Sequence, residues 1–134
     1  MQARKKEGVT SFVARHETGP LEARRFGALA GEIAGWRTII AQLGLIGLDP
    51  NRYDGVGYGN VSGRVGPYPG ERGQRPFLVS ATQTGALACV GLEQLALVQA
   101  YNARDNTVDS RGILPPSSES MTHGAVYDLA GHIR

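Results

Sequence analysis

The pattern of apolar positions changes once along the chain, from a helical period to a strand period. Between residues 21 and 45, apolar side chains recur at steps of three and four residues, at Leu29, Ile33, Trp36, Ile40 and Leu43. This spacing predicts one long amphipathic helix with those five residues as its buried stripe. Glu22 lies near its start, where a negative charge suits the helix dipole, and Gly44 or Gly47 can end it.

From residue 47 onward, short apolar runs are separated by segments rich in turn-forming residues. Four runs predict strands, at residues 58–65, 77–81, 97–101 and 107–111. Residues 102–106 contain Asn and Asp, which favour turns, so the last two strands are expected to form a hairpin. Residues 92–95 favour a helical turn.

Two consecutive prolines, at positions 115 and 116, then interrupt the pattern. Ser117 or Ser118 is expected to cap a final helix that runs to residue 133. Its buried side is predicted to comprise Met121, Val126, Leu129 and Ile133. This order of elements predicts an α/β fold of the α+β type: a layered α/β/α sandwich with a mostly antiparallel central sheet.

The first 20 residues show no clear periodicity and are predicted to form an N-terminal arm. Residues 21–134 are predicted to form one domain, because a chain of 134 residues suffices for a single core. The composition, 41% hydrophobic and 19% charged, is typical of a soluble globular protein.

Charge and hydropathy exclude several classes of partner. A net charge of +2 is too small to indicate nucleic acid binding, and no apolar run approaches the roughly 20 residues that span a bilayer. No apolar signal segment follows the basic residues near the N-terminus, so a cytoplasmic location is expected. The single cysteine, Cys89, excludes an internal disulfide and lies in an apolar run, where a packed core thiol is expected.

The glycine-rich loop at residues 55–60 departs from the order of a dinucleotide-binding loop. Asn60 holds the third glycine position, and a strand is predicted to follow the loop rather than to precede it. The loop suits a small anion better, because Gly59 lets the backbone approach a ligand and Asn60 offers an amide donor. A plain turn is the alternative interpretation.

Two later segments also offer donors to an anion. Thr84 and Gly85 follow a predicted buried strand, where a hydroxyl and exposed N–H groups can form a second corner. Ser117 and Ser118 place hydroxyl and N–H groups at a helix start, where the dipole favours phosphate, and Glu119 follows them. Taken singly, these segments are also typical of a strand-ending turn and a plain helix cap.

The three segments in this order resemble the class II aldolase and adducin head family. The matching stretches are residues 59–62, residues 80–85, and residues 116–119 with His123 and Tyr127 following, and the resemblance covers residues 21–134. The second stretch is more similar to a little-characterised bacterial branch than to the sugar-phosphate aldolases themselves. The resemblance implies a homo-oligomer that acts on a small phosphorylated sugar or a related carbonyl substrate.

The resemblance also implies roles for individual residues. The substrate phosphate would be held by Gly59, Asn60, Thr84, Gly85, Ser117 and Ser118. Glu119 would move the proton in a lyase or epimerase reaction, because cleavage beside a carbonyl needs a proton carrier. In that family a divalent zinc ion held by histidines stabilises the enediolate.

The histidines depart from the family pattern. The family has a His-x-His pair soon after the glutamate helix, whereas this chain has His16, His123 and His132 and no such pair. His123 lies four residues after Glu119, where supporting the helix start or the glutamate is the favoured role. The domain is therefore expected to be incomplete at the C-terminus, to hold no metal and to be inactive as this chain.

Two alternatives remain beside the enzyme lineage. One is a non-catalytic, adducin-head-like assembly module that uses the same fold. The other is a generic α+β ligand-binding domain whose motif matches arise by chance. The combination of Glu119 with three anion-binding corners favours the enzyme lineage, because a scaffold does not need them.

Overall fold

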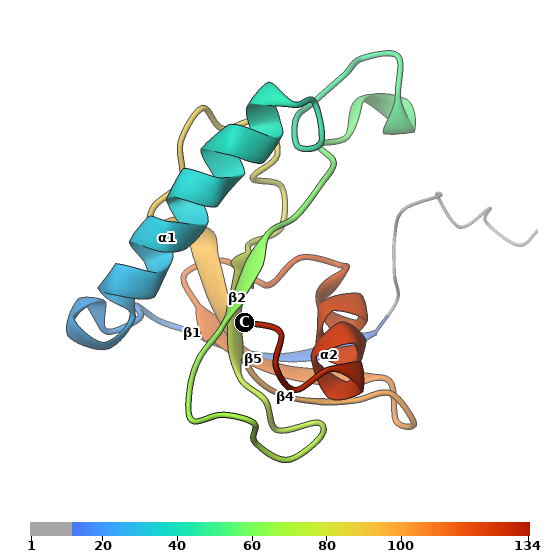
Figure 1. The fold of residues 1–134 in the computed structure, drawn as a ribbon. Helices are drawn as coiled ribbons and strands as arrows, with labels where there is room; N and C mark the ends of the chain where they lie inside the picture. The colour runs from blue at the N-terminus through green and yellow to red at the C-terminus, as the bar shows by residue number, and fades with distance from the viewer. Residues whose placement is uncertain (1–11) are drawn as a thin grey trace, which may run out of the picture.

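The computed structural model describes residues 12–134, which form five strands, two α-helices and two short 3-10 helices (Figure 1). In chain order these are β1 (Val13–Thr18), α1 (Ala23–Gln42), η1 (Tyr53–Gly55), β2 (Ser62–Arg64), β3 (Phe77–Ser80), η2 (Leu92–Gln94), β4 (Leu95–Asn102), β5 (Thr107–Gly112) and α2 (Ser120–Leu129). Both expected helices and all four expected strands are present, with ends that differ by a few residues. The expected helical turn is η2.

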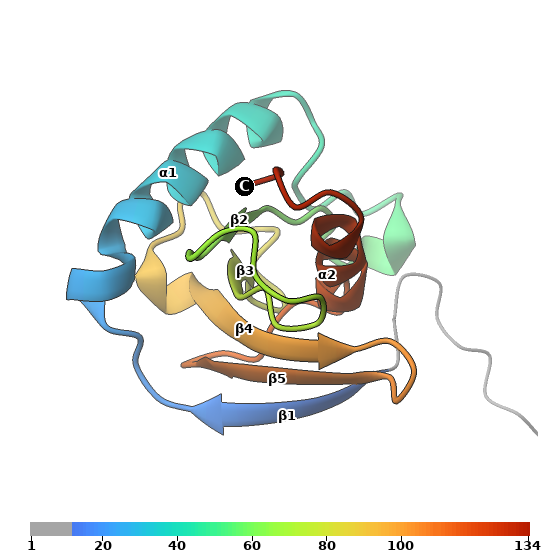
Figure 2. The ribbon, with the colours of Figure 1, turned by 60° about the horizontal axis from the view of Figure 1, so that its bottom comes forward.

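The strands form one sheet in the order β1-β5-β4-β3-β2. From β2 to β5 each neighbouring pair is antiparallel, and β4 and β5 form the expected hairpin with a bulge between Val98 and Ala100. β1 pairs parallel with β5, and Val13 lies opposite Thr107 (Figure 2). The expected α+β fold with a mostly antiparallel sheet is confirmed.

The two helices cover opposite faces of this sheet, and each face has its own apolar core. On one face α1 packs on the sheet. Its buried residues Phe26, Ala30 and Ile33 form one cluster with the strand residues Leu78, Leu95 and Leu97. On the other face α2 contributes Tyr127, which packs with Phe77, Val79, Val98, Tyr101 and Val108. Side chains alternate along β3, so Leu78 faces α1 while its two neighbours face α2. The expected α/β/α layering is confirmed.

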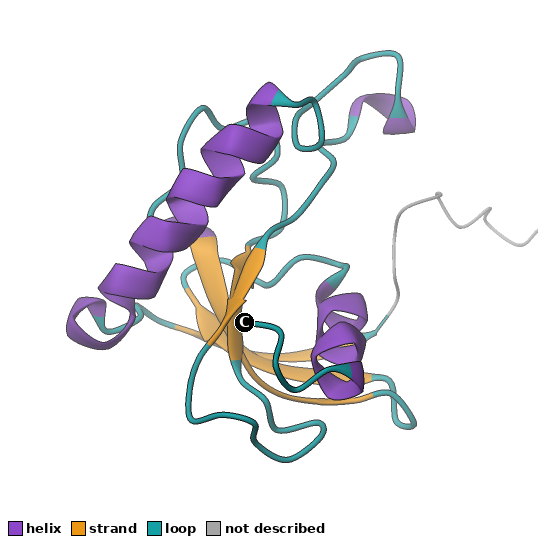
Figure 3. Cartoon of the chain, in the orientation of Figure 1, coloured by secondary structure: helices purple, strands orange, loops and turns teal. Residues whose placement is uncertain are grey.

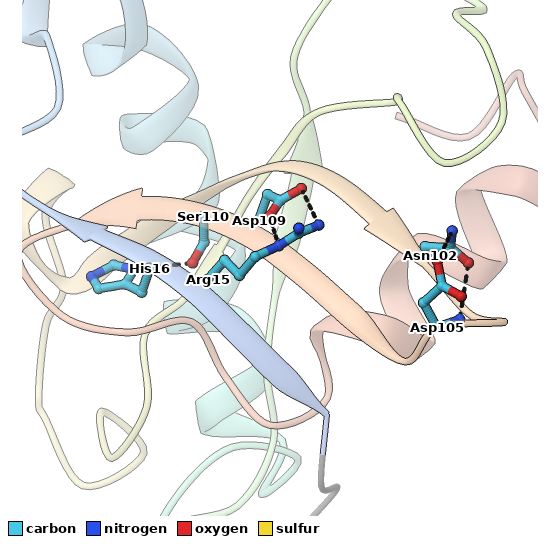
Figure 4. Close-up of polar contacts among 6 residues, drawn as sticks. All are labelled: Arg15, His16, Asn102, Asp105, Asp109 and Ser110. Carbon is cyan, nitrogen blue, oxygen red and sulfur yellow. Dashed lines mark hydrogen bonds and ion pairs between the residues drawn. The ribbon is translucent and has the colours of Figure 1, made fainter.

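Of the arm expected at residues 1–20, residues 1–11 lie outside the described part of the chain, and residues 13–18 instead form strand β1 at the edge of the sheet. Polar contacts with β5 fasten it: Arg15 forms an ion pair with Asp109, and His16 binds the hydroxyl of Ser110 at 3.0 Å (Figure 4). The strand was not predicted because its outward side chains are mostly polar and show no apolar alternation.

The buried side of α1 also differs from the predicted stripe. Phe26, Ala30, Ile33 and Arg37 are buried, whereas Trp36 is 63% exposed and Leu43 is 69% exposed. The helix extends past the ends of the strands, so its last turns lie beside loops rather than on the sheet (Figure 1). No helix within residues 12–134 is both long enough and apolar enough to cross a membrane.

In α2 the buried positions are mainly small. They are Ser120, Gly124 and Tyr127, whereas the predicted Leu129 is 84% exposed and Val126 is exposed as well. A Cβ on Gly124 would lie 2.7 Å from the ring of Tyr101, so close packing on that ring selects the face. The predicted face was wrong at Val126 and Leu129, because apolar size does not decide this contact, whereas Met121 and Ile133 are partly buried and pack against the core as predicted.

Cys89 is exposed, and the prediction of a packed core thiol was wrong. Its apolar neighbours, from residue 86 to residue 88, are exposed too, because they form a loop beyond the end of β3. A short apolar run therefore did not indicate burial here.

Candidate anion-binding site

One cavity of about 580 Å³ gathers the segments that the sequence singled out. It opens among the loops that enter β2, leave β3 and enter α2, drawn as teal segments in Figure 3. Seven of its lining residues are those named from the resemblance: Gly59, Asn60, Thr84, Gly85, Ser117, Ser118 and Glu119. Segments up to 60 positions apart in the sequence therefore meet at one place.

Ser80, the last residue of β3, fastens the loop that carries Asn60. Its hydroxyl accepts a hydrogen bond from the N–H of Val61 at 3.1 Å and donates one to the carbonyl of Val61 at 3.2 Å. The side-chain amide of Asn60 forms no hydrogen bond with another residue in the described part of the chain. That amide is therefore available to a ligand in the cavity.

Ser80 also fastens the segment that leads into α2. The N–H of Ser117 donates to the carbonyl of Ser80 at 3.1 Å, and the N–H of Thr82 donates to the carbonyl of Pro115 at 2.9 Å. Ala81 and Pro116 form an isolated bridge between these two hydrogen bonds. A polar residue within a buried strand is the signal that would have identified Ser80 from the sequence.

The expected serine cap of the last helix is not formed by Ser117 or Ser118. The N-cap of α2 is Glu119, whose side chain makes no capping hydrogen bond. The hydroxyl of Ser117 accepts from the N–H of Glu119 at 3.2 Å, and the side chain of Ser117 is buried. Ser117 and Ser118 thus lie two residues and one residue before the N-cap, and both line the cavity.

Glycines are required where the loops of the cavity touch. Gly59 has a φ of +82°, and a Cβ there would lie 2.2 Å from the carbonyl oxygen of Leu45. A Cβ on Gly85 would lie 3.0 Å from the Cα of Gly57. These contacts between backbones account for the glycines whether or not a ligand approaches.

In the segment of Thr84 and Gly85, which we call the phosphate corner, the expected hydroxyl donor is already used within the protein. The hydroxyl of Thr84 is buried and donates to the carbonyl of Ala81 at 2.9 Å, so it offers no proton to a ligand. Within residues 12–134, the backbone N–H groups of Thr84 and Gly85 donate to no other residue. The donors of this corner are therefore backbone groups, and the expected hydroxyl donor was wrong.

Arg37 lies directly behind this corner. Its guanidinium donates to the carbonyl of Thr84 at 2.8 Å and to the carbonyl of Gly85 at 3.4 Å, and the residue is only 2% exposed. The sequence analysis missed it because the predicted stripe contained apolar residues alone. Position 37 continues the buried positions Phe26, Ala30 and Ile33 at helical spacing, which is the signal that identifies it.

Glu119 lies at the edge of the cavity, where its carboxylate accepts a 3.3 Å hydrogen bond from the hydroxyl of Thr122. The imidazole of His123 binds Ser62 instead, with Nδ1 2.7 Å from the hydroxyl oxygen, and only the His123 backbone N–H bonds to the carbonyl of Glu119. Burial lowers the pKa of His123 below its usual value, and the Glu119 carboxylate opposes part of that change. His123 is therefore neutral at pH 7.

Another part of the cavity lining consists of aromatic and acidic side chains. Tyr53 and Asp54 belong to it and have φ angles of 52° and 54°, in the left-handed region that non-glycine residues rarely adopt. The ring of Tyr53 lies 5.4 Å from the ring of Tyr58, and Arg52 stacks over both. The cavity lining thus combines amide and hydroxyl groups with aromatic rings and the carboxylates of Asp54 and Glu119.

The zinc implied by the resemblance has no ligand set among the described residues. No group of three His, Cys, Asp or Glu side chains within residues 12–134 has the geometry to hold a metal ion. His16, on the edge strand β1, binds Ser110 and the carbonyl of Gly112 in β5. His132 is exposed near the C-terminus. These residues do not fit the metal, and no step through a metal follows from them.

Searches of family models, curated proteins and solved structures found no match to this chain. The interpretation of the cavity therefore depends on its geometry and on the residues that line it.

Proposed function

We propose that this chain is a class II aldolase-like domain whose cavity binds the phosphate group of a small phosphorylated sugar or a related carbonyl compound. In this proposal Glu119 is the proton carrier for a lyase or epimerase reaction beside the carbonyl. The metal that serves that family has no ligand set among the described residues, so the proposal assigns phosphate binding and proton transfer and nothing further.

The convergence of three donor segments on one cavity supports this proposal. The segments at positions 59–60, 84–85 and 117–118 come from three different loops, and β3 holds all three together through Ser80 and the residues after it. Chance motif matches in a generic domain have no reason to meet. Backbone N–H groups and small polar side chains facing one point are the usual way that proteins bind phosphate.

The chemistry of each part suits its proposed task. The amide of Asn60, the N–H of Gly85 and the serine segment supply donors to phosphate oxygens, which fixes the orientation of a substrate too small for apolar contacts. Glu119 adjoins the serine segment in sequence and lines the same cavity, so a carbonyl compound held there by its phosphate would present its carbon chain near the carboxylate. A positioned carboxylate typically contributes about 10²–10⁴-fold to such a proton transfer.

Phosphate binding tests the proposal directly. Inorganic phosphate and glycerol phosphate are titrated into ¹⁵N-labelled protein, and the amide resonances of Asn60, Gly85 and Ser118 are expected to shift together with one dissociation constant. Asn60→Ala should weaken binding about tenfold, as expected for a hydrogen bond to a charged group. Asn51→Ala, in an exposed loop, is the matched control and should leave the affinity unchanged. Shifts spread over the surface, or none, would contradict the proposal.

One observation favours the assembly module as a second candidate. The outward side of α1 exposes Trp36, Ile39 and Leu43, which are spaced to form one apolar stripe. Sedimentation velocity of the protein and of Trp36→Gln tests this candidate. A concentration-dependent oligomer that Trp36→Gln dissociates would support assembly through α1, and an unchanged sedimentation coefficient would exclude it.

A further inference from the structure

We propose that Arg37 is the buried counter-charge and the positioning residue of the phosphate corner. This inference depends on the proposed function, since it concerns the same cavity. Arg37 does not line the cavity; it lies one layer behind, in α1, and reaches the corner through the peptide groups of Thr84 and Gly85.

The geometry of a trans peptide determines what this contact does. The carbonyl of Thr84 and the N–H of Gly85 belong to one planar group and point in opposite directions. Arg37 binds the carbonyl at 2.8 Å, so the N–H of Gly85 points away from the guanidinium. Gly85 lines the cavity and Arg37 does not, so in this proposal the N–H of Gly85 faces the cavity.

The charges around the cavity give Arg37 a second task. No Arg or Lys is among the described residues that line the cavity, whereas Asp54 and Glu119 both are. A phosphate group carries up to two negative charges near neutral pH, and two carboxylates alone would repel it. The guanidinium of Arg37 is the positive group bonded directly to the peptides of the cavity wall.

The burial of Arg37 is consistent with such a task. It is 2% exposed, and within residues 12–134 the ion pairs join other residues, Arg15 with Asp109 and Arg111 with Glu17. A buried cation without a carboxylate partner is costly, even when backbone carbonyls accept its hydrogen bonds. An anion bound on the other side of the Thr84 peptide would supply the missing negative charge.

The test compares Arg37→Met, which removes the charge, with Arg37→Lys, which keeps it, and with Arg24→Met as a control on an exposed position of the same helix. Dissociation constants for glycerol phosphate are measured by NMR titration between pH 5 and pH 8. The wild-type protein is expected to bind more tightly as the phosphate loses its second proton near pH 6. Circular dichroism checks that each variant is folded.

Arg37→Met should weaken binding at pH 8 by about tenfold or more, equivalent to about 1.4 kcal/mol, and should flatten the pH profile. Arg37→Lys should restore most of the affinity and the pH dependence, and Arg24→Met should change neither. If Arg37→Met does not fold, Arg37→Gln is measured in its place, with the same expectation.

Two results would overturn this inference while leaving the proposed function intact. One is a folded neutral variant with wild-type affinity and pH profile. The other is an Arg37→Lys variant as weak as Arg37→Met, which would show that shape rather than charge matters. If the wild-type protein does not bind phosphate at all, it is the proposed function that fails.

Discussion

The hydroxyl oxygen of Ser62 lies 2.7 Å from Nδ1 of His123, so the edge strand β2 and the helix α2 are joined by a half-buried polar contact. The same hydroxyl lies 2.6 Å from the hydroxyl oxygen of Tyr127, whose pKa burial raises. When the imidazole is neutral and its Nδ1 carries no proton, Ser62 can donate to Nδ1 and accept the proton of Tyr127. Protonation of His123 at Nδ1 would reverse the first of these hydrogen bonds, because the Ser62 hydroxyl would then have to accept it.

The contact predicts a loss of stability in mild acid. Burial lowers the pKa of His123 in the folded protein below the ordinary value of 6.5, so the unfolded chain binds a proton more readily. The stabilising contribution is complete above about pH 6.5 and is lost as the pH falls through the lower pKa of the folded state. Urea unfolding at pH 7.5 and at pH 5.0 should show a lower free energy of unfolding at the acid pH.

Two variants identify the histidine responsible. His123→Gln should reduce the difference between the two pH values, whereas His132→Gln, at an exposed position, should preserve it. A pH dependence that survives in His123→Gln would assign it to other groups.

Gly59→Ala should destabilise the protein strongly. The new methyl group would lie 2.2 Å from the carbonyl of Leu45, and the φ of +82° is unfavourable for alanine, so a loss of roughly 1–3 kcal/mol or more is expected. Gly35→Ala is the matched control, because it lies in α1 with no atom within 4 Å of the added Cβ and should stabilise by roughly 0.5–1 kcal/mol. Thermal unfolding measures both. Equal melting temperatures for the two variants would contradict the close approach of these loops.

Glu119→Gln should separate proton transfer from anion binding. Removing a negative charge from the cavity edge should tighten glycerol phosphate binding slightly, by about two- to fivefold, because like charges repel. In a homologue that carries the metal ligands, the corresponding substitution should lower turnover with a phosphorylated carbonyl substrate by roughly 10²–10⁴-fold. Asp54→Asn, which removes the other carboxylate of the cavity, should affect affinity alone. A large loss of affinity in Glu119→Gln would indicate that this residue only supports the start of α2.

The residues described in the structure predict weak zinc binding and no retro-aldol turnover. A catalytic zinc site generally has three protein ligands and an open position, and residues 12–134 contain no such group. Bound metal is measured by mass spectrometry after dialysis against zinc, and turnover is measured on short sugar phosphates. Tight, stoichiometric zinc with turnover would mean that His16, His123 and His132 adopt an arrangement very different from the one described.

The sequence predicted the fold well where the apolar period decided the structure. The α1 segment, the β4–β5 hairpin and the layer order follow from local patterns that tertiary packing then preserves. The predicted stripe of α1 was wrong at Trp36 because the residue buried at this level of the helix is Arg37, and at Leu43 because the end of the helix extends beyond the sheet. Its period alone does not tell which turns have a partner to pack on.

For the cavity, residue types were more informative than periodicity. The seven residues chosen from three motifs line one cavity, although their binding roles stay predictions. The motifs do not contain Arg37, and they assign no role to Ser80, although both residues support the loops through backbone groups. A hydrogen bond to a carbonyl leaves no mark on the sequence of the loop that accepts it, so such supports become visible only in three dimensions.

β1 and β5 pair although 94 positions separate Arg15 from Asp109, and this has a consequence for folding on the ribosome. Protein synthesis proceeds at about 5–20 residues per second, so roughly 5–20 s pass between the emergence of β1 and that of the strand it pairs with. Throughout that interval β1 has no edge to join, whereas α1, β2 and β3 are already available to one another. Among the described strands, β1 is thus the first to be translated and one of the last to join the sheet.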